Sequence, residues 1–201
     1  MSSLTVLRVP VERLSTTGFA PFGHVIAAGS TRDDPTLNRA PGNMAFLWVI
    51  SELVTDGTPH IGVVSYRYRG SRVDYLQQHP GSTTVLVPID GRPSVVTVAP
   101  DSGGAPDIDA TRAFLLDGHR GIVVIPGVWI RYAYPLLEAA DFAYVTARLD
   151  ASHDIRRYAL ADAGRVMEWY FGPPTEPGTR LRSDGSVEGF DVVDLSDGPR
   201  S

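Results

Sequence analysis

Two arginines stand two residues apart in a segment whose residues alternate in type. The segment 61–69 reads IGVVSYRYR, and in a β-strand this spacing places Arg67 and Arg69 on one face and the tyrosines between them on the other. One interpretation is a hydrated outer face, where most arginines lie. The other is an anion site, because the forked donors of two guanidinium groups match a carboxylate.

The residue types that are missing exclude several kinds of chemistry. The chain has 201 residues and no cysteine, which removes disulfides, zinc thiolate sites and thiol nucleophiles. All 18 basic residues are arginine, so no side chain can form a Schiff base with a carbonyl substrate or with pyridoxal phosphate. We therefore expect no cofactor of that kind.

Charge and hydropathy limit the partners. The net charge is -5 and no basic stripe occurs, which argues against nucleic acid. No apolar run approaches the roughly 18 residues of a membrane span, and the N-terminus does not read as a secretion signal. The sequence thus predicts a cytoplasmic protein without a membrane partner.

Many short apolar segments are separated by glycine and proline. The central stretch, residues 79–100, contains a strand at Thr83–Val87, a corner at Asp90–Gly91 and a second strand at Ser94–Val98, which we expect to pair as a hairpin. Helical periodicity is almost absent. The pattern predicts an all-β protein with few short helices, a closed jelly-roll barrel of short antiparallel strands.

The predicted barrel forms one domain over residues 1–171. Residues 44–53, which include Trp48, are apolar enough for a buried strand. The paired arginines after Ile155 suit an exposed edge strand, and the aromatic segment Val166–Phe171 is expected to dock on the barrel or on a second subunit. Residues 172–201, rich in Pro, Gly, Ser and Asp, are expected to form a loosely ordered extension.

Several short motifs, taken in order, resemble those of the bacterial ureidoglycolate lyase family within the cupin superfamily. They are APFGHVI at 20–26, His79-Pro80, Val87-Pro88-Ile89, PDIDATRAF at 106–114 followed by Gly121, Val128-Trp129, and Tyr134-Pro135-Leu136. The resemblance covers residues 4–171. It implies a cupin-like barrel, a lyase acting on a small carboxylic acid, and a homodimer.

The chain departs from the family pattern at its polar positions. Where the family carries a glutamate before the His-Pro pair, this sequence has Gln77, and Thr84 replaces a glutamine. Around the tryptophan corner, Ile125, Ile130 and Arg131 stand where the family has histidines. Since cupin metal sites need several histidines, the resemblance with these replacements implies no bound metal.

The resemblance also suggests which residues act. Ureidoglycolate cleavage needs a group to hold the carboxylate, a base for the hydroxyl proton and an acid for the departing nitrogen. His79 is the expected base, and Tyr75 and Tyr132 are possible proton carriers. The expected substrate-binding residues are Arg67, Arg69, Gln77, Trp129 and Arg131.

Three functions remain open. The first is a diverged enzyme of this family that acts on another small polar acid, as the altered positions suggest. The second is a true ureidoglycolate lyase, which forms glyoxylate and urea. The third is a barrel that binds a small carboxylate without catalysis.

Overall fold

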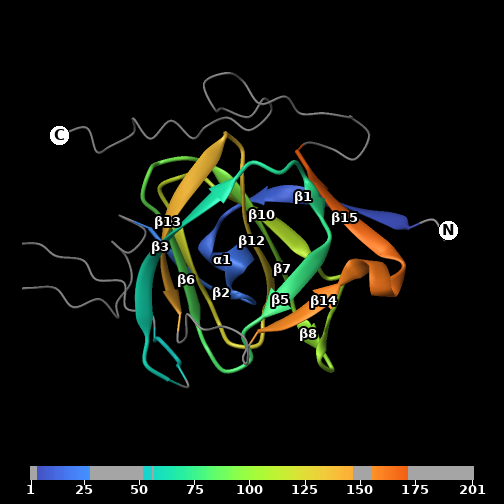
Figure 1. The fold of residues 1–201 in the computed structure, drawn as a ribbon, viewed down its shortest axis with the longest axis horizontal. Helices are drawn as coiled ribbons and strands as arrows, with labels where there is room; N and C mark the ends of the chain where they lie inside the picture. Colours follow the sequence, from blue (N-terminus) through green and yellow to red (C-terminus); the bar gives the residue numbers. More distant parts are fainter. Residues whose placement is uncertain (1–3, 28–51, 56, 147–154, 172–201) are drawn as a thin grey trace, which may run out of the picture.

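The computed structural model describes residues 4–27, 52–55, 57–146 and 155–171, and these form two facing β-sheets. Figure 1 shows the five-stranded sheet at the left and the eight-stranded sheet through the centre and right. The predicted all-β, cupin-like jelly-roll barrel is therefore confirmed. The described part contains one short helix, α1 (Thr16–Phe19), and one 3₁₀ turn, η1 (Leu160–Ala163).

The strand order follows a jelly-roll path rather than the order of the sequence. The eight-stranded sheet runs β14 (Arg156–Ala159), β5 (Tyr75–Gln78), β12 (Trp129–Pro135), β7 (Ser94–Ala99), β10 (Arg112–Leu116), β1 (Thr5–Arg13), β15 (Arg165–Tyr170), β4 (Arg72–Val73). The five-stranded sheet runs β2 (Gly23–Ile26), β11 (Gly121–Val124), β6 (Thr84–Pro88), β13 (Ala139–Thr146), β3 (His60–Arg67). A small ribbon pairs β8 (Asp101–Ser102) with β9 (Ala105–Pro106).

The central strands are buried on both faces. All six residues of β7 are buried, and its alternate side chains enter two different cores. Val96 and Val98 join the core between the two sheets, whereas Val95 and Ala99 join a second core on the other side. A strand covered on both faces favours apolar and β-branched residues, and four of the six residues of SVVTVA are apolar, while Ser94 and Thr97 each bury a hydroxyl.

The eight-stranded sheet curls to enclose this second core. β4 is the last strand at one end of the sheet and β5 is the second strand from the other end, yet Asp74 alone separates them in the sequence. The ends must therefore approach each other, and η1 covers the opening with the buried Leu160. β1 joins the curl through parallel pairs with both β10 and β15, which the antiparallel prediction did not include.

The predicted central hairpin is wrong. β6 and β7 pair with different neighbours in different sheets, so the Asp90–Gly91 corner carries the chain from one sheet to the other. Both strands were predicted correctly. Their pairing was not, because an Asp-Gly corner permits a sharp turn without fixing which strands pair across it.

Other local predictions have mixed outcomes. β14 is the predicted edge strand, and the aromatic segment is β15, which docks on β1 of the same chain. The short helix α1 begins after Ser15, whose hydroxyl caps it by accepting from Gly18 N at 3.0 Å. Residues 44–51, with Trp48, and the expected extension 172–201 lie outside the described residues.

Gly118 fixes the corner between the sheets. Its φ of +87° is left-handed, and a Cβ there would lie 2.1 Å from the carbonyl oxygen of Gly91. Gly103 has a similar φ of +67°, but a Cβ at that position would meet nothing within 4 Å. A side chain would therefore strain the backbone at both positions, but of the two only Gly118 would also place a Cβ in overlap with backbone atoms.

Gly118→Ala should destabilise the protein more than Gly103→Ala. Each substitution carries the left-handed penalty of about 1–2 kcal/mol. Gly118→Ala should cost about 1–3 kcal/mol more, since backbone must move to admit the methyl group. Chemical denaturation of both variants measures the difference, and equal losses would contradict the described corner.

Candidate functional site in the barrel

A buried histidine and a buried tyrosine meet inside the barrel. His79 follows β5, and Tyr132 lies on the neighbouring strand β12. Their side chains share a hydrogen bond of 2.8 Å between the Tyr132 hydroxyl and Nε2 of His79. The exposed fractions are 7% and 5%, so water has little access to this bond. The structure therefore brings together two of the three predicted catalytic residues.

Two further tyrosines complete the polar interior. The Tyr144 hydroxyl of β13 lies 3.4 Å from that of Tyr132, and the Tyr66 ring of β3 stacks on the Tyr132 ring with centroids 6.3 Å apart. Burial, followed by Tyr144, raises the pKa of Tyr132 well above its ordinary value. Burial likewise raises the pKa of Tyr66. Tyr132 thus keeps its proton at neutral pH and links His79 to Tyr144.

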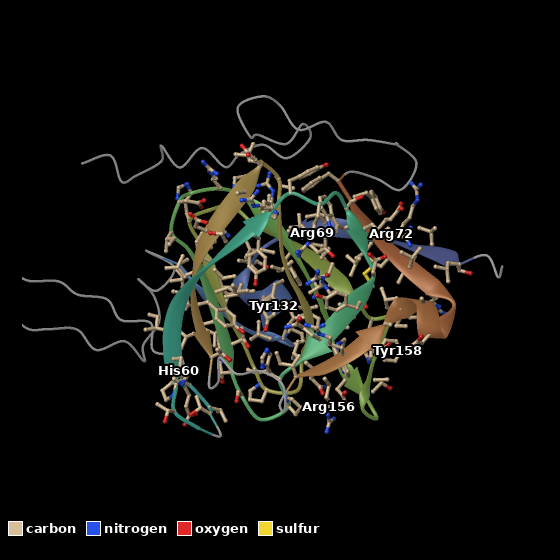
Figure 2. The ribbon with its side chains drawn as sticks, in the orientation of Figure 1. His60, Arg69, Arg72, Tyr132, Arg156 and Tyr158 are labelled. Carbon is tan, nitrogen blue, oxygen red and sulfur yellow. The ribbon has the colours of Figure 1, made fainter. Side chains whose placement is uncertain are left out.

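A bulge in β12 shapes the site. The pairing with β7 shifts between Arg131 and Tyr134, so one extra residue is accommodated there. Arg69 supports the bulge, because its Nη2 donates to the carbonyl oxygens of Tyr132 at 2.8 Å and Ala133 at 3.0 Å. Figure 2 shows Arg69 and Tyr132 close together in the middle of the molecule.

The guanidinium group of Arg131 lies near Arg69 and contacts an aromatic ring. Its guanidinium carbon is 4.0 Å from the centroid of Tyr75 and 5.7 Å from that of Tyr134. Nε of Arg131 is buried without a hydrogen-bond partner among the described residues. Burial, followed by the charge of Arg131, lowers the pKa of Arg69. This arrangement can receive an anion.

Two of the predicted substrate-binding residues lie elsewhere. Arg67 is exposed on the outer face of the five-stranded sheet, and lines an open surface depression with Tyr68 and Glu138. Trp129 is buried in the second core, where its indole N–H donates to Asp101 at 2.8 Å. Neither side chain is placed with the His79–Tyr132 pair. The predicted common face of Arg67 and Arg69 is wrong, because β3 ends at Arg67 and the alternation ends with it.

Gln77 occupies a buried position on β5 between two strands. It pairs with Ile130 of β12 on one side and with Arg157 of β14 on the other. The neighbouring Gln78 has a different role, since its amide donates to Asp101 and to the carbonyl of Gly127. Gln77 therefore lies near the site, and Gln78 fixes the corner that precedes β12.

The sequence analysis missed the roles of Tyr66 and Tyr144. Tyr66 was placed correctly on the face opposite Arg67, but only the structure shows that this face points into the barrel. Tyr144 alternates with Phe142 in β13, so its inward direction could have been inferred from that buried neighbour. Within the described ranges, no group of three His, Asp or Glu side chains could hold a metal ion, and no helix is long and apolar enough to span a membrane.

A family model and two relatives in sequence agree on one family. A family model described as ureidoglycolate lyase matches residues 6–167. A Burkholderia cepacia protein named ureidoglycolate lyase is 32% identical over 148 residues, covering 72% of this chain and 81% of that protein. A Brucella melitensis protein of the same name is 27% identical over 160 residues, covering 79% and 93%.

Solved structures show weaker likeness. A dTDP sugar isomerase from Desulfovibrio desulfuricans has a TM-score of 0.40 at 16% identity, covering 64% of this chain and 83% of that one. An oxalate decarboxylase from Lactobacillus farciminis has a TM-score of 0.37 at 14% identity, covering 63% and 34%. Likeness at this level says nothing about activity.

The buried tyrosines predict how stability depends on pH. A tyrosine whose pKa is higher in the folded state holds its proton more tightly there. Its contribution to the free energy of unfolding is therefore complete below the unfolded pKa of about 10 and is lost as the pH rises above that value. Tyr132→Phe should therefore reduce the fall in unfolding free energy above pH 10 by up to about 1.4 kcal/mol per pH unit. Urea denaturation at several pH values measures this.

The control is Tyr68→Phe, since Tyr68 is 59% exposed. Its slope above pH 10 should match that of the unaltered protein. If Tyr132→Phe also leaves the slope unchanged, Tyr132 does not hold its proton in the way its burial indicates.

Proposed function

The chain belongs to the ureidoglycolate lyase family, and we propose that it is a diverged enzyme of that family, which performs acid–base chemistry on another small polar carboxylic acid. The observation that carries the proposal is the buried bond between His79 and Tyr132, together with Tyr66, whose ring stacks on Tyr132 and whose pKa, raised mainly by burial, is lowered in part by the charge of Arg131. These residues supply a proton-exchanging pair and a cation without a metal.

Each group has a distinct proposed role. The guanidinium of Arg131 holds the substrate carboxylate. Imidazole ordinarily exchanges protons near neutral pH, so His79 receives the proton of the substrate hydroxyl, directly or through Tyr132. Arg69 holds the Tyr132 and Ala133 carbonyls and so acts as a positioning residue.

The same set can perform the family reaction, which is the second candidate. The hydroxyl of ureidoglycolate loses its proton, the carbon–nitrogen bond breaks with its electrons passing to nitrogen, and that nitrogen takes up a proton. The names of the relatives favour this candidate. The first is favoured by Gln77, Thr84 and Arg131, which stand where proton-carrying or polar family residues are expected and which alter what the site can bind.

Turnover of a panel of small hydroxy acids, ureidoglycolate included, separates the two candidates. Release of urea at an enzymatic rate from ureidoglycolate alone supports the second. Turnover of another hydroxy acid in preference to ureidoglycolate supports the first. If no acid in the panel is turned over and only binding is seen, both enzyme proposals fail and the non-catalytic barrel remains.

Arg131→Gln should lower kcat/KM for the accepted substrate by roughly ten- to a hundred-fold, because a charge-assisted carboxylate contact is lost. Arg131→Lys should recover only part of that, since a lysine lacks the forked donor geometry. Arg67→Gln is the control, because Arg67 lies on the outer face. His79→Ala should lower kcat more than it weakens binding.

Equal effects of Arg67→Gln and Arg131→Gln would contradict the assigned anchor. Loss of binding without a larger loss of kcat in His79→Ala would make His79 a positioning residue.

The predicted homodimer remains a proposal, but we now propose a different surface for its interface. The aromatic strand β15 was its first argument, yet Met167, Trp169 and Phe171 are buried within the chain. The outer face of the five-stranded sheet has an apolar part instead, at the half of β3 away from Arg67. On its edge strand β3, Ile61 and Val63 are 76% and 68% exposed.

The apolar face continues across the sheet. Val63 lies opposite Ala143, which lies opposite Val87, and the next row joins Ile61, Val145 and Val85 in the same way. Among the described residues, β3 has a neighbour on one side only. A self-complementary edge of this kind suits two-fold pairing with a second copy.

Val63→Glu should therefore convert a dimer into a monomer of 21.7 kDa in light scattering. Val6→Glu is the matched control, because Val6 is 47% exposed on β1, outside this face. A monomeric unaltered protein at micromolar concentration would contradict the dimer, and a dimeric Val63→Glu variant would contradict the surface.

A further inference from the structure

Three arginines alternate with two tyrosine rings along one side of the candidate site. Arg69 lies 4.1 Å from the centroid of Tyr134, and Arg131 lies 5.7 Å from the same ring. Arg131 lies 4.0 Å from the centroid of Tyr75, and Arg157 lies 5.4 Å from that ring. We call the series Arg69–Tyr134–Arg131–Tyr75–Arg157 the arginine–tyrosine ladder. Two guanidinium carbons that contact the same ring cannot be farther apart than the sum of their distances to the centroid of that ring.

The three arginines of the ladder form no ion pair among the described residues. The five ion pairs found there involve other arginines. Asp74 lies near enough to act on Tyr134, but Arg72 holds its carboxylate at 2.8 Å. Cation–π contacts offset part of the repulsion between like charges without neutralising it. Three cations gathered without an ion pair to any of them favour an anion that carries more than one charge.

Arg157 reaches the ladder because of its place in the sheet. It lies directly opposite Gln77 on β5, so its side chain is on the same side as that of Gln77. The sequence analysis gave this residue only the role of blunting an edge strand. Arg156, next to it, is directed the other way and acts on Asp101 instead. Figure 2 shows Arg156 at the lower edge of the molecule, away from Arg69 and Tyr132.

We propose that the ladder binds a small dicarboxylic acid, with one carboxylate on Arg131 and the second on Arg157 across the Tyr75 ring. The inference rests on the proposed function, which places the first carboxylate on Arg131. It goes further by giving Arg157 a binding role and by narrowing the substrate class to acids with two negative groups. Gln77, opposite Arg157, supplies an amide that can hydrogen-bond a polar group between them.

A calorimetric titration compares two acids that differ in the second carboxylate. L-malate carries two carboxylates and L-lactate one, and both are 2-hydroxy acids. At low ionic strength, malate should bind about tenfold more tightly than lactate, because Arg157 is exposed and its contact is partly screened. Inorganic phosphate is a third ligand, which tests whether any dianion suffices. Phosphate is too small to span two arginines and should bind no more tightly than lactate.

The variants locate the second contact. Arg157→Gln should remove the preference for malate and leave lactate affinity unchanged. Arg156→Gln, the matched control on the same strand, should leave both affinities unchanged. The proposal is overturned if malate and lactate bind equally, if Arg157→Gln weakens both to the same extent, if Arg156→Gln has the same effect as Arg157→Gln, or if phosphate binds as tightly as malate.

The outcomes separate this inference from the proposed function. Lactate binding that depends on Arg131, without any preference for malate, would leave the proposed anchor standing and overturn the second subsite. A preference for malate that depends on Arg157, in a protein that turns over no acid, would uphold the subsite and overturn the proposed enzyme.

Discussion

The hydrogen bonds from Arg69 to two consecutive carbonyl groups hold the candidate site together. At the bulge in β12, the carbonyls of Tyr132 and Ala133 need donors that a regular ladder does not supply, and one guanidinium nitrogen satisfies both. Charge-assisted bonds of this kind contribute about 1.5–3 kcal/mol each. The bulge in turn allows Tyr132 to face His79 within the barrel while Arg131 and Tyr134 contact each other in the arginine–tyrosine ladder. One interaction therefore places both the proton-exchanging pair and the cation.

The two-core architecture makes this arrangement possible. β12 is an inner strand of the eight-stranded sheet, between β5 and β7, and is covered on both faces, so its residues contribute to two different cores. Ile130 packs in the barrel, whereas Trp129 packs in the second core, where Asp101 and Gln78 fix it. Close packing on both faces of a strand restricts the conformations that its side chains can adopt. Site geometry thus depends on packing far from the site itself.

The sequence predicted the strands better than it predicted which strands pair and which way their side chains point. Residue patterns identified β7, β11 and β12, because β-branched runs between glycine corners depend on local preferences. They failed for the β6–β7 pairing, which depends on contacts distant in sequence. Arg69 shows the same limit, since its direction follows from where β3 ends rather than from the alternation before it. His79 and Tyr132 were found through family resemblance and chemistry, and their contact could not be inferred from residues 53 positions apart.

The most direct test of the account is a crystal structure of the protein with glyoxylate, the smallest acid that offers a carboxylate and a carbonyl oxygen. The account predicts the carboxylate on the guanidinium of Arg131 and the carbonyl oxygen within about 3 Å of the Tyr132 hydroxyl or of His79. Glyoxylate bound only at the surface depression beside Arg67, or absent from the crystal at saturating concentration, would contradict it.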